Sequence, residues 1–223
     1  MRVTLKLATS LDGRIATATG ESRWITGEAA RTQVHKLRAI HGAVLVGVAT
    51  AIADDPELTV RLPGYVGPQP TRVVLDTNLR LPLDGKLVRD AGRLDTAVIT
   101  AQASNDGLSA AGVTLLTVGV TDGWVDLRRA MSALEAHMHK RQGLPAWYGA
   151  DLLIEGGGQV AASFLSAGLV DAIEWFRAPI ILGDEGRPAV GEFVLQRLKD
   201  APRFKRVAVH ELGDDLWERY ERG

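Results

Sequence analysis

The 223-residue sequence contains no cysteine, and only 5% of its residues are aromatic. Without cysteine the chain cannot form disulfides, thiolate nucleophiles or cysteine-ligated zinc sites. Neither sign of charge dominates, because 26 Lys and Arg against 27 Asp and Glu give a formal net charge of −1. Basic residues are also spread along the chain rather than grouped in blocks. We therefore expect neither nucleic acid nor an anionic membrane as a partner.

Long hydrophobic runs are absent as well. The longest apolar stretch, residues 43–53, is too short to span a bilayer, and Lys6 interrupts any apolar core of a signal peptide. A cytoplasmic protein is therefore expected. With 46% hydrophobic and 24% charged residues the composition is that of a packed globule, and no linker divides the chain, so we predict a single domain over residues 1–223.

Strand-like and helix-like patterns alternate along the chain. Helices are predicted over residues 27–40, with Thr26 as N-cap, over 127–140, and over 159–167, with Gly168 as C-cap. Strands are predicted over residues 3–8, 43–47, 72–76, 96–100, 113–118, 151–154, 172–176, 179–182, 204–210 and 216–220. This order predicts an α/β fold with a mainly parallel central sheet flanked by helices, and antiparallel C-terminal strands at one edge.

A glycine turn, Gly156-Gly157-Gly158, stands between a predicted strand and a predicted helix. Such a corner exposes backbone N–H groups at a helix start and suits a phosphate. The pattern alone also fits a tight turn without any ligand, because it follows several strands rather than the first strand.

Three basic side chains, Arg31, His35 and Arg38, share one narrow face of the first predicted helix. Such a face is either simply solvated or an anion site, since guanidinium groups match phosphate oxygens. Asp54 and Asp55 precede a proline and indicate turn chemistry rather than a metal site, so we expect no metal.

Four spaced motifs carry a resemblance to a known family. They are residues 6–13 (KLATSLDG), 22–27 (SRWITG), 54–61 (DDPELTVR) and 152–159 (LLIEGGGQ). Together they resemble the reductase domain of the riboflavin-biosynthesis deaminase/reductase family, whose fold is that of dihydrofolate reductase. Many relatives carry a second, deaminase domain whose zinc ligands include two cysteines. This chain has no cysteine and lacks the extra length of a deaminase domain, so the resemblance implies a stand-alone reductase. It also implies a homodimer, as in relatives, and leaves open whether a separate deaminase is a partner.

The resemblance implies NADPH-dependent reduction of 5-amino-6-(5-phospho-D-ribosylamino)uracil, by hydride transfer to C1′ of the ring-opened ribosyl imine. The implied cofactor-binding residues are Ala8, Trp24, Thr50, Asp54, Thr77, Gly157, Gly158, Gln159, Val160, Ala161, Ala162 and Ser163. The implied substrate-binding residues are Ser22, Arg38, Leu58, Arg61 and Glu155. Arg31 and His35 are expected at the surface.

Lys6 and Glu155 are the expected catalytic residues. A partly buried lysine loses some of its preference for the charged form, which suits it to donate a proton to the developing product. Glu155 would orient the uracil or Lys6. Lys6 is equally compatible with a solubilising role on an edge strand.

Two other functions stay open. A dihydropterin reductase on the same fold would need the apolar pocket but has no use for a phosphate-binding set such as Ser22, Arg38 and Arg61. A non-catalytic nucleotide-binding module would keep the glycine turn but would not need Lys6 and Glu155.

Overall fold

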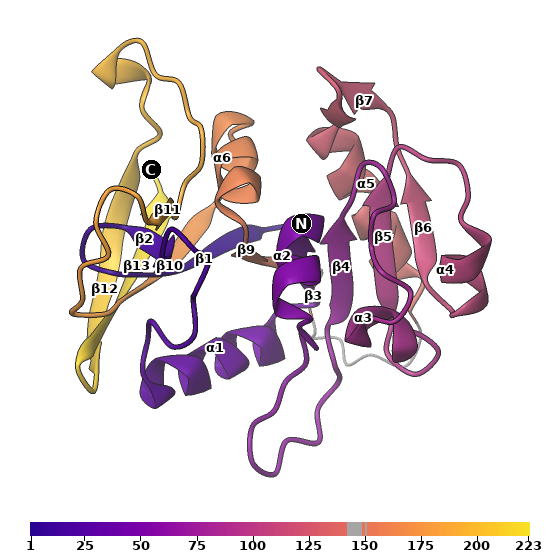
Figure 1. Cartoon of the computed structure of the whole chain (residues 1–223), viewed down its shortest axis with the longest axis horizontal. Coiled ribbons are helices and arrows are strands. Elements are labelled where there is room, and N and C mark those ends of the chain that lie inside the picture. Colours follow the sequence, from indigo (N-terminus) through magenta and orange to yellow (C-terminus); the bar gives the residue numbers. More distant parts are fainter. Residues whose placement is uncertain (142–148, 150) are drawn as a thin grey trace. The chain divides into compact units, whose positions relative to one another are not determined.

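The computed structural model describes residues 1–141, 149 and 151–223. The backbone divides into two compact units (Figure 1). The central unit comprises Met1 and His35–Leu153, and the terminal unit comprises Arg2–Val34 and Ile154–Gly223. Each unit is described by itself, and a single domain over the whole chain stays a prediction.

Four parallel strands form the sheet of the central unit, in the order β3 (Ala43–Gly47), β4 (Thr71–Leu75), β5 (Thr96–Thr100) and β6 (Thr114–Thr117). Every residue of β3 and β5 is buried. Parallel strands covered on both faces need such continuous apolar runs, which is why these segments could be recognised in the sequence.

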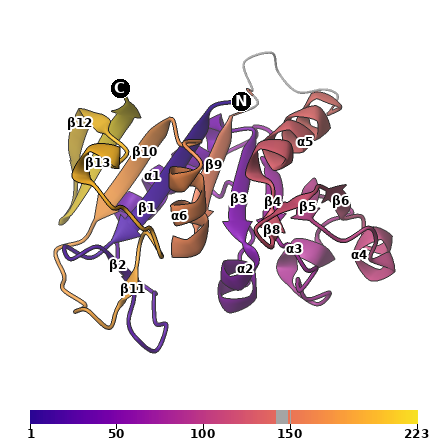
Figure 2. The same cartoon turned by 90° about the horizontal axis from the view of Figure 1, so that it is seen from above.

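Helices lie on both faces of this sheet. Figures 1 and 2 show α5 (Leu127–His139) on one face, and α2 (Val48–Asp54) and α3 (Lys86–Arg89) on the other. The predicted stripe of α5 is confirmed, since Met131, Leu134 and Met138 are buried. Two short elements complete the unit: α4 (Asp106–Ala110) and a hairpin of β7 (Val120–Thr121) with β8 (Trp124–Val125).

The terminal unit is built on β1 (Val3–Thr9), which is parallel to β10 (Ala172–Arg177). Next to β10 come β13 (Asp215–Arg222) and then β12 (Phe204–Leu212), both antiparallel to their neighbours. The other neighbour of β1 is β9 (Leu152–Gly156), whose last three residues belong to this unit. The predicted combination of mainly parallel strands and an antiparallel C-terminal pair is thus confirmed.

The helices of the terminal unit follow two predicted patterns. Helix α6 (Gly158–Ser166) follows β9 directly, and α1 (Glu28–Ile40) begins in this unit and continues into the central one. Figures 1 and 2 show α6 on one side of β1 and the start of α1 on the other. A short ribbon of β2 (Arg14–Ala16) with β11 (Arg187–Pro188) and a 3₁₀ turn, η1 (Leu198–Asp200), are also present.

Two predictions of local structure are wrong. Helix α1 begins after Gly27, whose carbonyl accepts the first helical bond from Arg31 N, so Thr26 lies one residue too early to be the N-cap. Residues 179–182 form no strand. Their backbone bonds instead to the turn after β1: Ile180 O accepts from Leu11 N, and the Asp12 carboxylate accepts from Leu182 N. Pro179 lacks the N–H that a ladder would use.

Within residues 1–141, 149 and 151–223, no helix combines the length and the hydropathy that a bilayer span requires.

Candidate functional site

The expected catalytic pair lies on neighbouring strands of the terminal unit. Lys6 is in the middle of β1, and Glu155 is near the end of the adjacent β9. Both side chains are half-buried. Burial along β1 alternates, so that Thr4, Lys6 and Ala8 share one face of the strand. Partial burial makes the charged form of a lysine less favourable, which suits a lysine to donate a proton.

A buried carboxylate that the sequence analysis did not single out, Glu174, faces Lys6. The two residues are paired in the register of β1 with β10, so their side chains leave the sheet on the same face. Glu174 is 4% exposed, and its carboxylate accepts hydrogen bonds from Trp217 Nε1 at 2.7 Å and from Arg219 Nε at 3.0 Å. The sequence signal was an acidic residue in the middle of an apolar strand, since a buried carboxylate needs partners.

The same face continues one pair further along the sheet. Ala8 is paired with Phe176, which is paired in turn with Trp217. The Phe176 and Trp217 rings stack with centroids 6.0 Å apart and an interplanar angle of 2°. Ala8, an expected neighbour of the cofactor, is therefore a small residue beside a pair of stacked aromatic rings.

The glycine corner has the geometry of an anion cradle at only some of its positions. Gly157, at φ +90°, precedes α6, and no side chain caps this helix within the described structure. The first N–H groups of a helix have no partner inside it, which leaves those of Gly158, Gln159 and Val160 suited to phosphate oxygens. The amide of Ala161 already donates to Gly157 O.

Other features of this corner serve packing. A Cβ on Gly158 would stand 2.5 Å from Pro188 O, so this glycine is required by a neighbouring segment whether or not a ligand binds. Val160, Ala161 and Ala162 are buried, and exposed Ser163 donates its hydroxyl proton to Gln159 O. The two interpretations of this glycine turn, a phosphate site and a tight turn without a ligand, thus each fit part of the corner: the free amides suit a phosphate, and Gly158 is needed for packing.

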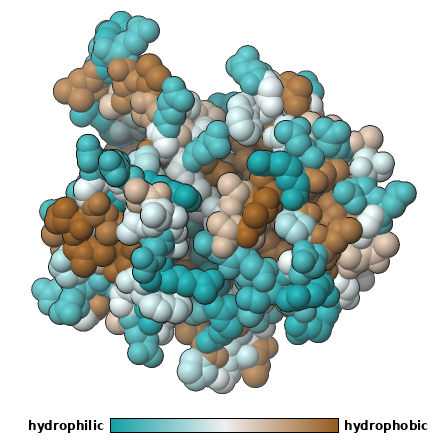
Figure 3. Space-filling view, viewed as in Figure 1, coloured by the Kyte–Doolittle hydropathy of each residue, from teal (hydrophilic) through white to brown (hydrophobic). Residues whose placement is uncertain are grey.

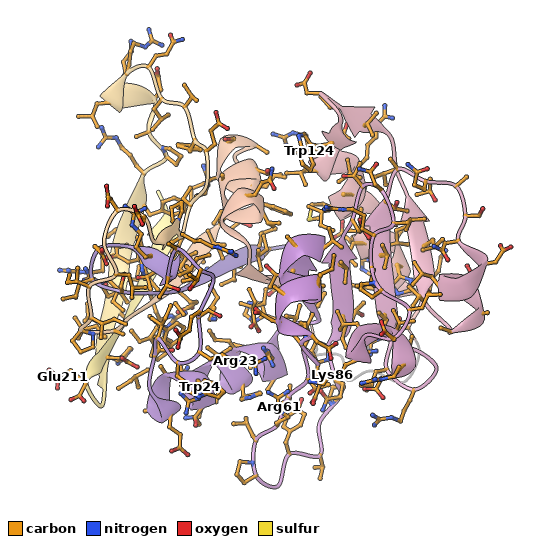
Figure 4. All side chains as sticks on the ribbon, in the orientation of Figure 1. Arg23, Trp24, Arg61, Lys86, Trp124 and Glu211 are labelled. Atoms are coloured by element: carbon orange, nitrogen blue, oxygen red, sulfur yellow. The ribbon has the colours of Figure 1, made fainter. Side chains whose placement is uncertain are left out.

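Trp24 is not a core residue, because 71% of it is exposed (Figure 4). The Arg31 guanidinium lies 4.4 Å from the centre of its ring, and Arg31 Nη1 also donates to Thr26 O at 2.8 Å. Arg31, expected at the surface, is half-buried and holds the indole. One face of Trp24 is thereby backed by a planar cation, an arrangement that stiffens the ring.

The loop that carries Ser22 and Trp24 is also fixed at its end. Gly27 N donates to the Asp215 carboxylate at 2.6 Å, and Asp215 is 4% exposed. Ser22 is half-buried, and its carbonyl accepts from Ile25 N. A buried carboxylate on β13 therefore sets where this loop ends and α1 begins.

In the central unit, the expected substrate-binding residues converge on residues 57–61. Arg38, 9% exposed, donates from Nη1 to Thr59 O at 2.9 Å. Arg61 is exposed (Figure 4), and its Nη1 donates to Glu57 Oε2 at 3.1 Å. Leu58 is 2% exposed with φ +55°, so its side chain is a core anchor, and only its backbone is suited to a ligand. Arg38 thus holds the segment rather than presenting an open guanidinium.

The remaining cofactor residues lie elsewhere in the central unit. Thr50 and Asp54 are one turn apart on α2, and both are half-buried. Neither of them lines the pocket of about 180 Å³ beside this helix, whose lining residues are Ala51, Ile52, Asp55, Leu81, Pro82, Asp84, Gly85 and Leu87. Thr77 follows β4, and its carbonyl accepts from Ala101 N and Thr100 Oγ1.

Across the part of the chain that the structure describes, no three histidine, aspartate or glutamate side chains group closely enough to hold a metal ion. Asp55 is a turn residue, as expected, with φ +40° and its carboxylate accepting from Lys86 N at 2.7 Å.

Comparison with known proteins gives one consistent result. The family model described as RibD C-terminal domain matches residues 1–217. The riboflavin biosynthesis protein RibD of Bacillus amyloliquefaciens is 38% identical over 220 residues, covering 96% of this chain and 55% of the relative. The protein of the same name from Escherichia coli is 35% identical over 225 residues, covering 96% and 58%. The chain thus spans little more than half the length of these relatives.

Solved structures agree with this match. Acinetobacter baumannii RibD superposes with a TM-score of 0.82 at 34% identity, over 100% of this chain and 58% of that one. A Thermotoga maritima protein described as a diaminohydroxyphosphoribosylaminopyrimidine deaminase and 5-amino-6-(5-phosphoribosylamino)uracil reductase gives 0.77 at 28%, over 100% and 56%. The Saccharomyces riboflavin biosynthesis reductase Rib7, at 19% identity and 0.74 over 100% and 90%, shows the same fold.

Proposed function

The chain belongs to the RibD C-terminal domain family, and from this premise we propose that it is a reductase of riboflavin biosynthesis. The proposed reaction is the NADPH-dependent reduction of 5-amino-6-(5-phospho-D-ribosylamino)uracil to its ribitylamino product. The observation that carries the proposal is the placement of two half-buried ionisable residues, Lys6 on β1 and Glu155 on β9, on neighbouring strands. A non-catalytic nucleotide-binding module would have no use for that pair.

The residues present fit a dinucleotide phosphate. The amides of Gly158, Gln159 and Val160 at the start of α6 would hold the pyrophosphate, since no side chain in the described structure caps this helix. Ala8 leaves room on β1 for a flat ring. When bound, NADPH would supply the hydride that reduces C1′ of the ring-opened imine. Trp24, Thr50, Asp54 and Thr77 are proposed as further contacts to this cofactor.

Lys6 is proposed to donate a proton to the substrate from its ammonium group. Glu155 would hold this ammonium or the uracil in place, and buried Glu174, in register with Lys6, lies on the same face of the sheet. Ser22, the backbone of Leu58 and the guanidinium of Arg61 are proposed to bind the substrate, with Arg61 at its phosphate and Arg38 fixing the segment from below.

The experiment is NADPH oxidation, followed by absorbance, with freshly deaminated pathway intermediate. Lys6→Met is expected to lower turnover at least a hundredfold, the contribution typical of a general acid, while the Kd for NADPH stays within about twofold. Exposed Lys36→Ala serves as the control lysine variant. Turnover by Lys6→Met at the wild-type rate would remove Lys6 from the mechanism.

The second candidate function is a dihydropterin reductase on the same fold. The exposed Arg61 and its anchored segment favour the phosphorylated substrate, because a simple dihydropterin offers no group for them. Assaying dihydrofolate beside the ribosylaminouracil decides between the two. Faster oxidation of NADPH with dihydrofolate would reverse the assignment.

Two partner assignments belong to the same proposal. The Thermotoga maritima protein is named a deaminase as well as a reductase, so we propose that a deamination supplies the substrate here too. We also propose a homodimer. In its support, two exposed apolar residues, Val194 (79% exposed) and Leu198 (84%), lie between β11 and β12, and Figure 3 shows hydrophobic residues within the projection at its upper left. Sedimentation of the wild type and of V194S/L198S tests it, with a monomeric wild type as the contrary result.

A cytoplasmic location stays a prediction from the sequence.

A further inference from the structure

Residues 57–61 belong to no helix or strand, yet side chains from elsewhere bond to their backbone at successive residues. Thr59 O accepts from Arg38 Nη1 at 2.9 Å. Val60 is bonded on both sides by Gln69, whose Oε1 accepts from Val60 N at 2.7 Å and whose Nε2 donates to Val60 O at 3.2 Å. These two bonds give Val60 what a neighbouring strand would otherwise supply.

The next residue in this segment is Arg61, and its backbone is held by a histidine. Arg61 N donates to His35 Nδ1 at 3.2 Å, and both residues belong to the central unit. The contact requires Nδ1 of His35 to carry a lone pair rather than a proton. His35, expected at the surface, is half-buried.

The side chain of Arg61 is directed as well. Its Nη1 donates to Glu57 Oε2 at 3.1 Å and to Thr59 Oγ1 at 3.3 Å, which lie four and two residues earlier in the chain. Because a guanidinium has five donors, these two contacts leave others for a ligand anion. The base of the segment is anchored by Leu58, which is 2% exposed and takes up a left-handed conformation.

We propose that His35 and Gln69 are positioning residues that fix the backbone of residues 60–61 and so hold the Arg61 guanidinium ready for the substrate phosphate. The inference rests on the proposed function, which gives Arg61 its ligand. A loop ordered before binding loses less conformational entropy when the anion arrives, so its affinity is higher than that of a flexible loop with the same arginine. Neither side chain touches the substrate in this assignment; both act through Arg61.

The test uses three substitutions at one position. His35→Ala removes the acceptor, His35→Asn places an amide oxygen where Nδ1 stands, and His35→Gln places its amide where Nε2 stands. His35→Ala and His35→Gln are expected to raise the KM for the phosphorylated substrate about fivefold to tenfold, the equivalent of one hydrogen bond, with kcat within about twofold. His35→Asn is expected to restore the KM to within about twofold. Lys36→Ala, exposed and adjacent on α1, is the control.

A second readout needs no turnover. Hydrogen exchange of the peptide covering residues 57–61 is expected to accelerate in His35→Ala and to return toward the wild-type rate in His35→Asn. Gln69→Ala is expected to accelerate the same peptide, because Val60 loses both of its side-chain bonds. It provides an independent variant should His35→Ala fold poorly.

Failure of the inference and failure of the proposed function give different results. If Arg61→Ala weakens calorimetric binding of ribose 5-phosphate while His35→Ala and Gln69→Ala do not, the positioning role is overturned and the proposed phosphate site stands. If Arg61→Ala leaves that binding unchanged, the proposed phosphate site is wrong, and the positioning role toward a phosphate falls with it. Equal KM values for His35→Asn and His35→Ala would also overturn the role of Nδ1.

Discussion

The buried carboxylate of Asp215 gives the sharpest stability prediction, because one bond joins β13 to the start of α1. Asp215 is 4% exposed and accepts from Gly27 N at 2.6 Å. A hydrogen bond to a charged group contributes about 1.5–3 kcal/mol to stability. A carboxylate near a helix N-terminus adds about 0.3–1 kcal/mol. Asp215→Ala should therefore cost about 2–4 kcal/mol.

Thermal and urea unfolding measure this cost. For a chain of this size, 1 kcal/mol corresponds to about 2–4 °C in Tm, so Asp215→Ala should lower Tm by on the order of 5–10 °C. Asp215→Asn keeps an acceptor and loses only the charge, and should cost less than half as much. Asp214→Ala, exposed and adjacent, is the matched control. A Tm for Asp215→Ala within 1–2 °C of that control, on the scale of the same conversion, would show that the Gly27 contact contributes little.

Three further predictions concern separate sites. The Ser10 hydroxyl and the amides of Leu182 and Gly183 lower the pKa of Asp12 from 3.8 to about 2. The stability that Asp12 contributes is therefore present above pH 3.8 and is lost as the pH falls through about 2. Asp12→Asn should accordingly be less stable than wild type at neutral pH and equal to it below that window, by urea unfolding. Arg31→Ala should raise the KM for NADPH about twofold to fivefold by releasing the Trp24 ring, and the KM of Arg31→Lys should lie between those of wild type and Arg31→Ala. Identical KM values for the two variants would refute the stacking role. Arg72 is 1% exposed, and burial lowers its pKa to about 10. Because Arg72→Met keeps the aliphatic volume, it should be more stable to urea than Arg72→Ala by about 2 kcal/mol. Equal urea midpoints for the two variants would contradict this.

Where one rule governs a segment, the sequence was sufficient to predict the structure. The strands at 43–47 and 96–100 have apolar centres and are buried at every residue because both faces are covered, and they occur with the predicted bounds. Residues 179–182 show the opposite case. Their apolar side chains suggested a strand, but the Asp12 carboxylate, about 170 positions away in the chain, accepts the amides that a ladder would have used. No local pattern reveals that competition.

The basic face of α1 shows the same limit for the site. The helical spacing placed Arg31, His35 and Arg38 on one narrow face, and all three make contacts that organise a loop. Periodicity predicts which side chains share a direction, but it cannot say which loop they meet. The partners, Trp24 for Arg31 and residues 59–61 for the other two, follow from the path of the chain after each strand.

Those contacts also distinguish the roles of Arg38 and Arg61. A resemblance carries over a residue type at a position, and it assigned a substrate contact to Arg38, while His35 was expected at the surface. In the structure Arg38 is 9% exposed with its guanidinium on Thr59 O, while His35 receives the amide of Arg61. An exposed cation with partly used donors, Arg61, is the group suited to a dianion, and a buried one is suited to hold backbone. The phosphate affinity of this segment should therefore depend on α1 through geometry as well as through charge, which is why replacing His35, neutral in this contact, is the informative experiment.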